Sequence, residues 1–387
     1  MIPLSYSVRS IFRRRFSALA TAGGLGLVVF VFAAVLMLAS GVEETLRATG
    51  SRENAMILRK GATSELTSFM PRDAASGVAA DRTVATDQGK QVASPELFVV
   101  FQLTRSDGTQ SANVGFRGVS KDGWDLLRSK TVKLIDGRAP QWGTSEVMLG
   151  RATRGRYQGA QVGQSISIAR RQWQVVGVFE ASGSGFESEI WGDVDQIADA
   201  AHRIGYSTMT VRLKSPSEMG TLKTTIDGDP RWNLEAKRED IFFEEASGQL
   251  AAFIRGLGTV IAVFFAFGAV LGAMVTMYAQ VASRVREIGT LRALGFGRGS
   301  VLFSFLVESL MLAVLGAVAG CIFAALLGSL SFTTTNFSSF TEIKFRFHFA
   351  PGVAISATIF AILMGFFGGL LPAIRAARMP IAEATKG

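Results

Sequence analysis

Cysteine and histidine, the residue types that most often build zinc sites and activate nucleophiles, are scarce in this sequence. The chain has 387 residues but one cysteine, Cys321, and two histidines, His202 and His348. A single thiol excludes a disulfide framework and a thiolate metal cluster within one copy, and two imidazoles exclude a multi-histidine zinc site. The sequence therefore predicts no metal site.

The motifs of phosphate binding and hydrolysis are also missing. A Walker A loop needs a glycine, four residues and then Gly-Lys-Ser/Thr, so that backbone amides surround the phosphates. Gly89-Lys90 lacks the upstream glycine and is followed by Gln91, and the sequence has neither HExxH nor GxSxG. Paired acids such as Glu43-Glu44 fit solvated charge. We therefore expect a chain with no catalytic residues that is not an enzyme and binds no cofactor itself.

Glu308 is the one acid well inside an apolar stretch, which runs from residue 301 to 330. A carboxylate within a membrane is a candidate functional group because its burial is costly. Glu308 lies close to one end of the stretch, where it could reach Arg298 or lipid head groups. A structural role is our main interpretation, and a role in proton or substrate transfer, or in coupling this helix to the preceding loop, stays open.

The elements around these residues are predicted to be membrane helices. Hydrophobic residues make up 48% of the chain and charged residues 18%, and the mean hydropathy is +0.31, whereas soluble domains are about a quarter charged. A span needs about 20 apolar residues. Residues 16–42 could form a signal peptide after Arg13–Arg15, but the run is too long for one. We expect four transmembrane helices, at about 17–41, 256–281, 302–330 and 351–373.

The basic residues predict the orientation of these helices. The segment before the first helix, the one between the second and third, and the tail after the fourth together hold 11 Lys and Arg but two acids, which accounts for the whole net charge of +9. Positive charge marks cytoplasmic segments. We therefore expect a multi-pass protein of the inner membrane with both termini cytoplasmic, residues 43–250 extracytoplasmic, and no nucleic-acid partner.

Residues 43–250 are long enough to fold as a domain of mixed α and β structure. Alternating or β-rich runs predict strands, and three polar-apolar stretches predict helices. Residues 70–95 and 182–188 look like mobile loops, and 331–350 like a short connection. The strands are expected near 55–58, 97–103, 147–150, 164–168, 173–179 and 209–213, and the helices near 123–129, 193–203 and 217–227.

Two pairs of glycines in the spans have the spacing of helix-packing motifs. Gly268 and Gly272 lie in the second predicted helix, and Gly316 and Gly320 in the third. A glycine four residues from another lets two helix backbones approach closely. These pairs predict packing faces, and the sequence leaves open whether the partner is in the same chain or in a second copy.

The segment between the second and third helices carries the most specific pattern. Residues 283–301 read SRVREIGTLRALGFGRGSV. We expect 284–294 to extend the second helix, with Gly295 and Gly297 ending it. Ile288, Leu291 and Leu294 would share a stripe at helical spacing, which suits a protein contact.

This segment resembles the cytoplasmic signature of MacB/FtsX-type ABC transporter permeases. The tail 372–384, PAIRAARMPIAEA, resembles that family's closing motif, and residues 162–168 and 174–179 resemble its extracytoplasmic domain. The layout of one span, a large outer domain and three spans is similar too. The resemblance implies three parts: residues 1–42 with the first helix, a MacB-like domain at 43–250, and an FtsX-like domain at 251–387.

The resemblance also implies partners and a mechanism. Two copies of an ATPase on a separate chain would bind ATP and Mg²⁺, and a second permease copy, in our interpretation an identical one, would complete a dimer in the bilayer. ATP-driven motion would reach the outer domain by mechanotransmission and export or extract a substrate. The residues implied to couple to the ATPase lie in the coupling segment, residues 284–300: Arg284, Arg286, Glu287, Ile288, Leu291, Arg292, Leu294, Gly295 and Arg298.

Two other functions stay open at this point. A non-transporting FtsX-like transducer would control a cell-envelope partner such as a cell-wall hydrolase, although its outer domain is usually smaller. An unrelated receptor would not need the 284–300 motif. An efflux pump would add a periplasmic adaptor and an outer-membrane channel. The sequence identifies neither the substrate nor the ATPase.

Overall fold

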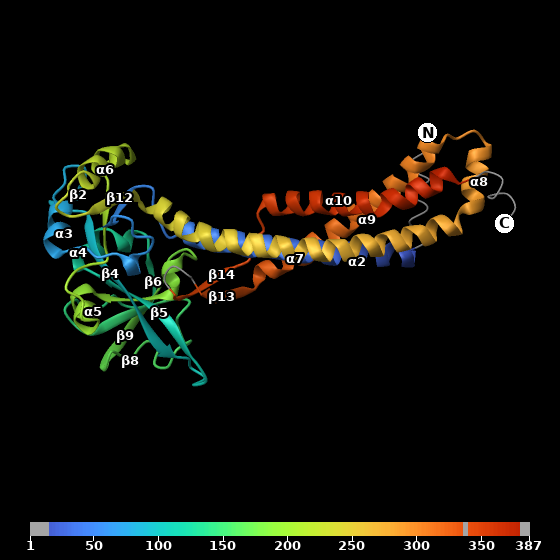
Figure 1. The fold of residues 1–387 in the computed structure, drawn as a ribbon. Coiled ribbons are helices and arrows are strands. Elements are labelled where there is room, and N and C mark those ends of the chain that lie inside the picture. The colour runs from blue at the N-terminus through green and yellow to red at the C-terminus, as the bar shows by residue number, and fades with distance from the viewer. Residues whose placement is uncertain (1–14, 336–339, 380–387) are drawn as a thin grey trace. The chain divides into compact units, whose positions relative to one another are not determined.

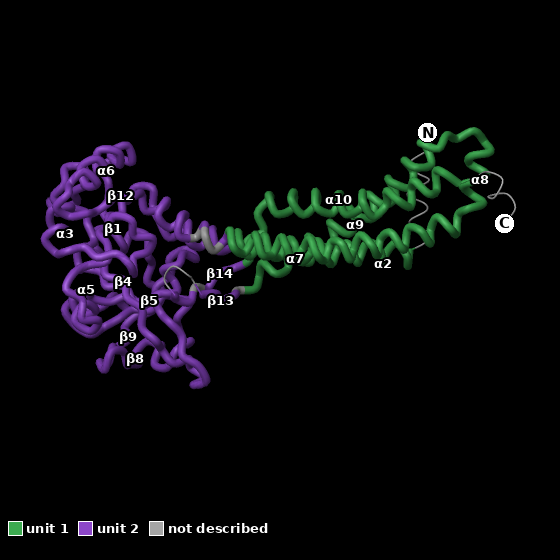
Figure 2. Tube along the Cα trace, in the orientation of Figure 1, with its two compact units in different colours: residues 1–40, 252–330, 347–387 green, residues 41–251, 331–346 purple. Residues whose placement is uncertain are grey.

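The computed structural model describes residues 15–335 and 340–379 (Figure 1). The chain divides into two compact units (Figure 2), which we call the helical bundle and the α/β domain. The bundle comprises residues 1–40, 252–330 and 347–387, and the α/β domain comprises 41–251 together with 331–346. Residues 331–346, which connect two spans in the sequence, thus cluster with the α/β domain.

Four helices of the described chain are long and apolar enough to cross a membrane, which confirms the prediction of a four-span bundle. Each helix extends beyond the predicted run at one end or at both, because polar residues continue the helix there. The helices are α2 (Arg15–Arg47), α7 (Glu239–Ser283), α9 (Arg298–Leu326, continued by the 3-10 turn Leu327–Ser329) and α10 (Pro351–Arg378).

Glycines set the contact between α2 and α9. A Cβ added to Gly316 would lie 2.7 Å from the carbonyl oxygen of Ala22, and one added to Gly320 would lie 2.6 Å from that of Gly26. A side chain at either position would push the two backbones apart. In contrast, a Cβ at Gly268 or Gly272 would meet no heavy atom within 4 Å. The first pair therefore packs within the chain, and the second pair faces away from the described part of it.

The helix predicted to continue from the second span through residue 294 is interrupted. Helix α7 ends at Ser283, Arg284 has φ −114° and ψ 17°, and a separate helix α8 (Val285–Ala293) follows. Gly295, with φ +94°, lies just beyond the end of α8. The continuous-helix prediction is thus wrong at Arg284, where the backbone leaves the helical region.

The α/β domain is built on a ten-stranded mixed sheet, as the prediction of a mixed α/β domain required. Most neighbouring strands are antiparallel, but β5 and β10 are parallel, as are β7 and β9. The strand order is β12-β1-β11-β4-β5-β10-β7-β9-β6, with β8 paired to β9. The strands are β1 (Asn54–Arg59), β4 (Ala93–Thr104), β5 (Ser111–Val119), β6 (Lys133–Gly137), β7 (Glu146–Gly150), β8 (Ser165–Ile168), β9 (Arg171–Glu180), β10 (Glu189–Asp193), β11 (Thr208–Arg212) and β12 (Leu234–Arg238).

The alternation of side chains along the strands gives the sheet two different faces. Val114 and Phe116 of β5 join an apolar core with helix α5 (Val194–Ala200), while α3 (Arg72–Ala79) and α6 (Met219–Asp227) cover the β1 and β11 end of that core. On the other face, Val119 packs with aromatic residues of α4 (Lys121–Leu126) and the start of α7. Arg117 lies on this second face and is fully buried.

Three segments that the sequence presents as loops have defined structure. Residues 70–95 contain α3 and the short strands β2 (Thr86–Asp87) and β3 (Lys90–Gln91). Within 182–188, the Glu187 carboxylate accepts backbone N–H groups of Ala181 and Gly183 at 2.9 and 2.7 Å, and a 3-10 turn (Gly185–Ser188) follows. The strands β13 (Ser331–Thr335) and β14 (Glu342–Arg346) pair antiparallel, and we call this pair the hairpin. Hydrogen bonds between a side chain and the backbone, such as those of Glu187, give no periodic pattern in the sequence that would predict them.

Candidate functional site

Helix α8 turns one face of the coupling segment toward the bundle. Arg284, Ile288 and Arg292 are four residues apart, so they lie on the same side of the helical turns. Ile288 is buried and Arg284 is only 6% exposed. These three of the predicted coupling residues therefore contact the spans.

Arg284 forms an ion pair with Glu308 of α9. The Arg284 Nη1 atom lies 2.8 Å from the Glu308 Oε2 atom, and both side chains are almost fully buried. The guanidinium also lies over the ring of Phe305, 5.7 Å from its centre. Glu308, expected to reach Arg298 or lipid head groups, thus pairs with the residue at the break between α7 and α8. A buried carboxylate with a guanidinium partner is a charge-neutral joint between two helices.

Ile288 and Arg292, the other two residues of the inner face, contact α9 and α10. Ile288 packs in a small apolar cluster with Val301 and Phe305 of α9 and Ala373 and Ala376 of α10. Arg292 donates hydrogen bonds from Nη1 to the carbonyl oxygens of Ala377, at 3.0 Å, and Met379, at 3.4 Å. A cation at the end of α10 satisfies carbonyl groups that lack helical partners and favours the helix dipole.

The remaining coupling residues are more exposed, although the Glu287 carboxylate lies 3.7 Å from the Arg284 guanidinium of the inner face. Arg286, Glu287, Gly295 and Arg298 are exposed, and Leu291 is half-buried. Leu294 is 72% exposed although it is a large apolar residue. The expected stripe of Ile288, Leu291 and Leu294 is not a single face, because α8 ends at Ala293 and Leu294 leaves its helical direction. The coupling segment therefore has an inner face bound to the spans and an outer face that presents charge and one apolar side chain.

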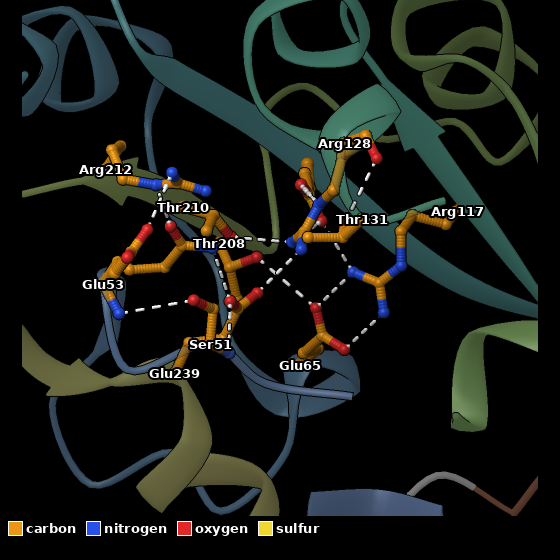
Figure 3. Close-up of polar contacts among 12 residues, drawn as sticks. Ser51, Glu53, Glu65, Arg117, Arg128, Thr131, Thr208, Thr210, Arg212 and Glu239 are labelled. Carbon is orange, nitrogen blue, oxygen red and sulfur yellow. Dashed lines mark hydrogen bonds and ion pairs between the residues drawn. The ribbon is translucent and has the colours of Figure 1, made fainter. Parts of the chain in front are cut away.

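At the other end of α7, a buried ion network holds the first residue of the helix (Figure 3). The Glu239 carboxylate pairs with Nη1 of Arg128 at 2.7 Å, and it accepts the Asn54 amide at 2.7 Å and the Ser51 backbone N–H at 3.0 Å. Arg128 also binds Glu96 of β4 at 2.7 Å. The start of α7 and the segment after α2 are thus tied to the central strands.

Arg117 of β5 extends this network. Its guanidinium lies 2.6 Å from Glu65, 2.8 Å from Glu96 and 2.8 Å from Glu189. Two guanidiniums therefore face four carboxylates: Glu65, Glu96, Glu189 and Glu239. The excess of negative charge in a buried site favours protonation of one acid.

The buried network shifts the pKa values of two of its carboxylates, Glu96 and Glu189, in opposite directions. Burial opposes ionisation of Glu96, but the charges of Arg128 and Arg117 outweigh it, and the pKa of Glu96 is lower than usual. Burial raises the pKa of Glu189 above its ordinary value despite the opposing charge of Arg117. Relative to an ordinary carboxyl group, the network therefore favours the charged form of Glu96 and the neutral form of Glu189.

The β13–β14 hairpin contacts the domain through a second, smaller group of charges. The carboxylate of Glu342 binds Nη2 of Arg105, and it accepts a hydrogen bond from Nη2 of Arg156 at 2.8 Å. The Lys344 backbone N–H donates to the Ser188 hydroxyl at 3.0 Å. The segment that joins α9 to α10 is thereby attached to the sheet and to the turn before β10.

The sequence analysis did not find the ion network or the Glu342 contacts. A signal was present in β5, where Arg117 interrupts the apolar run NVGFRGV. A lone arginine in such a run needs buried acids, but their positions are set by long-range strand pairing. Among the described residues, no group of three or more Cys, His, Asp or Glu is placed to hold a metal ion.

The ion pair at the helix break leads to a first prediction. Replacing Arg284 or Glu308 singly by Met leaves one charge buried, and each change should lower the free energy of unfolding by about 3–5 kcal/mol. The double variant R284M/E308M removes both charges and should be more stable than either single variant. Thermal unfolding of the detergent-purified chain measures this. Equal or additive losses in the double variant would contradict the pairing.

The two acids of the network give a second prediction. Because its folded pKa is lowered, ionised Glu96 contributes stability that is present above its unfolded pKa and lost as pH falls through its folded pKa. Glu189 has a raised pKa, so its contribution is present below its unfolded pKa and lost as pH rises through its folded one. At neutral pH, E96Q should therefore lower the unfolding temperature more than E189Q.

Unfolding temperatures of the two variants and the parent between pH 4 and pH 8, a range that spans the ordinary carboxyl pKa, measure the difference. E96Q should also flatten the loss of stability on acidification. A larger effect of E189Q at neutral pH would refute the assignment of charge within the network.

Comparison with known proteins assigns both halves of the chain. Residues 17–228 match the MacB-like periplasmic core domain, and residues 259–381 match the FtsX-like permease C-terminal domain. A curated relative, the pyoverdine export ATP-binding/permease protein PvdT of Pseudomonas savastanoi pv. phaseolicola, is 30% identical over 244 aligned positions, and the alignment covers 58% of this chain. The chain spans about a third of that relative, 35% of its length.

Solved structures with similar coordinates are extracytoplasmic domains. The periplasmic region of MacB from Actinobacillus actinomycetemcomitans has 15% identity and a TM-score of 0.37, and covers 52% of this chain and 94% of its own. The extracellular domain of the transporter YknZ from Gram-positive bacteria has 11% identity and a TM-score of 0.35, with coverages of 48% and 99%. The MacB-like match alone spans more than half of the residues. The chain therefore belongs to the MacB/FtsX family of ABC transporter permeases.

Proposed function

We propose that this chain is the permease subunit of an ABC transporter in the inner membrane, and that it relays the motion of a separate ATPase subunit to its α/β domain. In this proposal the α/β domain lies outside the cytoplasm and both termini lie inside. Two ATPase copies bind ATP and Mg²⁺, and two identical permease chains form the dimer. The relayed motion exports or extracts a substrate.

The observation that carries this proposal is the two-faced coupling segment. Its outer face exposes the apolar side chain of Leu294, at 72%, and the charged side chains of Arg286 and Glu287. A short segment that exposes both apolar and charged side chains suits a protein partner better than lipid. Its inner face is joined to α9 through Glu308 and to α10 through the carbonyl of Ala377. A push on α8 would thus act on three spans rather than on α7 alone.

The α/β domain has corresponding attachments for those spans. Glu239, the first residue of α7, is held by Arg128 in the buried network. The hairpin between α9 and α10 is held through Glu342 by Arg105 and Arg156. Each of these helices therefore continues in sequence into a segment that is anchored by ion pairs in the domain. This supports a relay in which movement of α7, α9 and α10 displaces the domain.

Export is the direction that the curated relative supports. The name of PvdT describes that protein as a pyoverdine export ATP-binding/permease protein. For this chain we propose export or extraction of a substrate whose class is set by the α/β domain and its periplasmic partners. A non-transporting transducer would need the same coupling segment. The segment therefore does not distinguish the two functions, and transport must be measured directly.

The coupling proposal gives a third prediction. The chain is co-expressed with its candidate ATPase, and the complex is purified through a tag on the permease and assayed for ATP hydrolysis in lipid nanodiscs. Glu287→Ala, Leu291→Ala and Leu294→Ala should each reduce ATPase recovery about tenfold, a loss of about 1.4 kcal/mol in binding. Their unfolding temperatures should stay close to that of the parent chain.

Matched variants separate assembly from folding. Arg378→Ala removes an exposed charge at the end of α10 and should leave ATPase recovery unchanged. Ile288→Ala, on the buried face of α8, should lower the unfolding temperature as a core truncation does. Normal ATPase recovery by all three outer-face variants would exclude this segment as the docking site. If no ATPase is recovered with the parent chain either, the permease proposal itself fails.

A further inference from the structure

The α/β domain contains an open polar cleft that neither the ion network nor the coupling segment uses. Its volume is about 530 Å³, within the range of about 300–1,000 Å³ that small-ligand sites have. Four segments form its walls: the end of α2, the turn after β7, the turn between β9 and β10, and strand β14. The lining residues are Thr45, Arg151, Ala152, Glu180, Ser182, Gly183, Glu187, Lys344, Phe345 and Arg346.

The acidic side chains of the cleft have partners within the domain, whereas two of its basic side chains form no salt bridge with a described residue. Its two acids are already engaged, because Glu187 accepts two backbone N–H groups and Glu180 lies 3.4 Å from Arg151. Lys344 and Arg346 are exposed, and neither side chain forms a salt bridge with any residue in the described ranges. Two positive charges therefore remain available to a ligand.

The geometry of β14 directs both cations to the same side. Lys344 and Arg346 are two residues apart on a strand, so their side chains leave the same face. Phe345 between them is 3% exposed and packs inward. The hydrogen bond from the Lys344 backbone to Ser188 fixes this part of the strand. The pair is therefore held at the surface of the cleft by the burial of its neighbour.

The cleft lies close to the ends of two membrane helices along the chain. Arg346 precedes the first residue of α10, Pro351, by five residues, which span at most about 18 Å. Thr45 is three residues beyond the uncharged run that ends at Val42. In the proposed topology both points lie at the outer surface of the membrane, where the phosphates of the outer leaflet are found.

We propose that this cleft binds the phosphate headgroup of an anionic phospholipid of the outer leaflet. Lys344 and Arg346 pair with the phosphate oxygens, Arg346 through a forked contact and Lys344 as a point charge. The choice of leaflet rests on the proposed topology, whereas the binding itself does not depend on the ATPase. Because β14 joins α9 to α10, a bound lipid would contact the same hairpin that Glu342 attaches to the domain.

Lipid retention by the full chain tests this site. The protein is purified in mild detergent, incubated with phosphatidylglycerol or phosphatidylcholine, and examined by native mass spectrometry. The parent chain should retain phosphatidylglycerol in preference to phosphatidylcholine. K344Q/R346Q should lower phosphatidylglycerol retention about tenfold, the loss of two charge contacts. K130Q/K133Q removes the same charge from exposed positions of the same domain and should have no effect.

Three outcomes would overturn the proposal. Retention by K344Q/R346Q equal to the parent's, in a variant with an unchanged unfolding temperature, would exclude the site. An equal loss in K130Q/K133Q would show that net charge alone attracts the lipid. Displacement of the lipid by millimolar inorganic phosphate would identify a site for soluble anions instead. No ATPase is present in this measurement. A negative lipid result would therefore contradict the lipid site alone, and a failed ATPase co-purification would contradict the permease proposal alone.

Discussion

A charge buried near the end of a membrane span must be neutralised where it lies, and this constraint shapes the coupling segment. Glu308 is inside α9, and the guanidinium that neutralises it comes from Arg284, at the break between α7 and α8. Arg284 leaves the helical backbone conformation at the end of α7, and its guanidinium contacts α9 from there. Once the chain has turned, Ile288 and Arg292 reach α9 and α10, and the opposite face of α8 is left exposed.

The four spans could be predicted from the sequence, because a run of uncharged residues long enough to cross a bilayer is enough to indicate a membrane helix. The faces of α8 could not, because they depend on a partner 24 residues away. Local periodicity groups Ile288, Leu291 and Leu294 together, whereas the structure buries the first and exposes the last. Glu308 was predicted to lie close to one end of its apolar stretch. In the structure α9 begins at Arg298, ten residues before Glu308, and the partner Arg284 comes before the loop rather than after it.

In the α/β domain the strands with clear alternation or strong β-forming composition, such as β8 and β4, were predictable, whereas β5 and β10, which carry Arg117 and Glu189 of the ion network, were not. β5 contains glycines and a buried arginine, and β10 is only five residues long. Residues 65, 96, 117, 189 and 239 are far apart in sequence and meet only through strand pairing. A pattern read in short windows contains no information about such a meeting. The same limit hid the attachment of the hairpin through Glu342.

The described attachments of the α/β domain to segments that lead into the spans combine ion pairs with apolar contacts, such as those of Phe242 and Phe243 at the start of α7. The ion pairs bear on the relay in their own way. Apolar contacts lose energy gradually as surfaces slide, since they depend on area rather than direction. A buried guanidinium with several carboxylates depends on distance and alignment, so displacement of one partner leaves charge unsatisfied at a cost of several kcal/mol. Arg128 with Glu239 therefore resists separation, and the partly exposed pairs of Arg105 and Arg156 with Glu342 do so less strongly. A force on the first joint is passed through the 3-10 turn that contains Arg128 to Glu96 of β4.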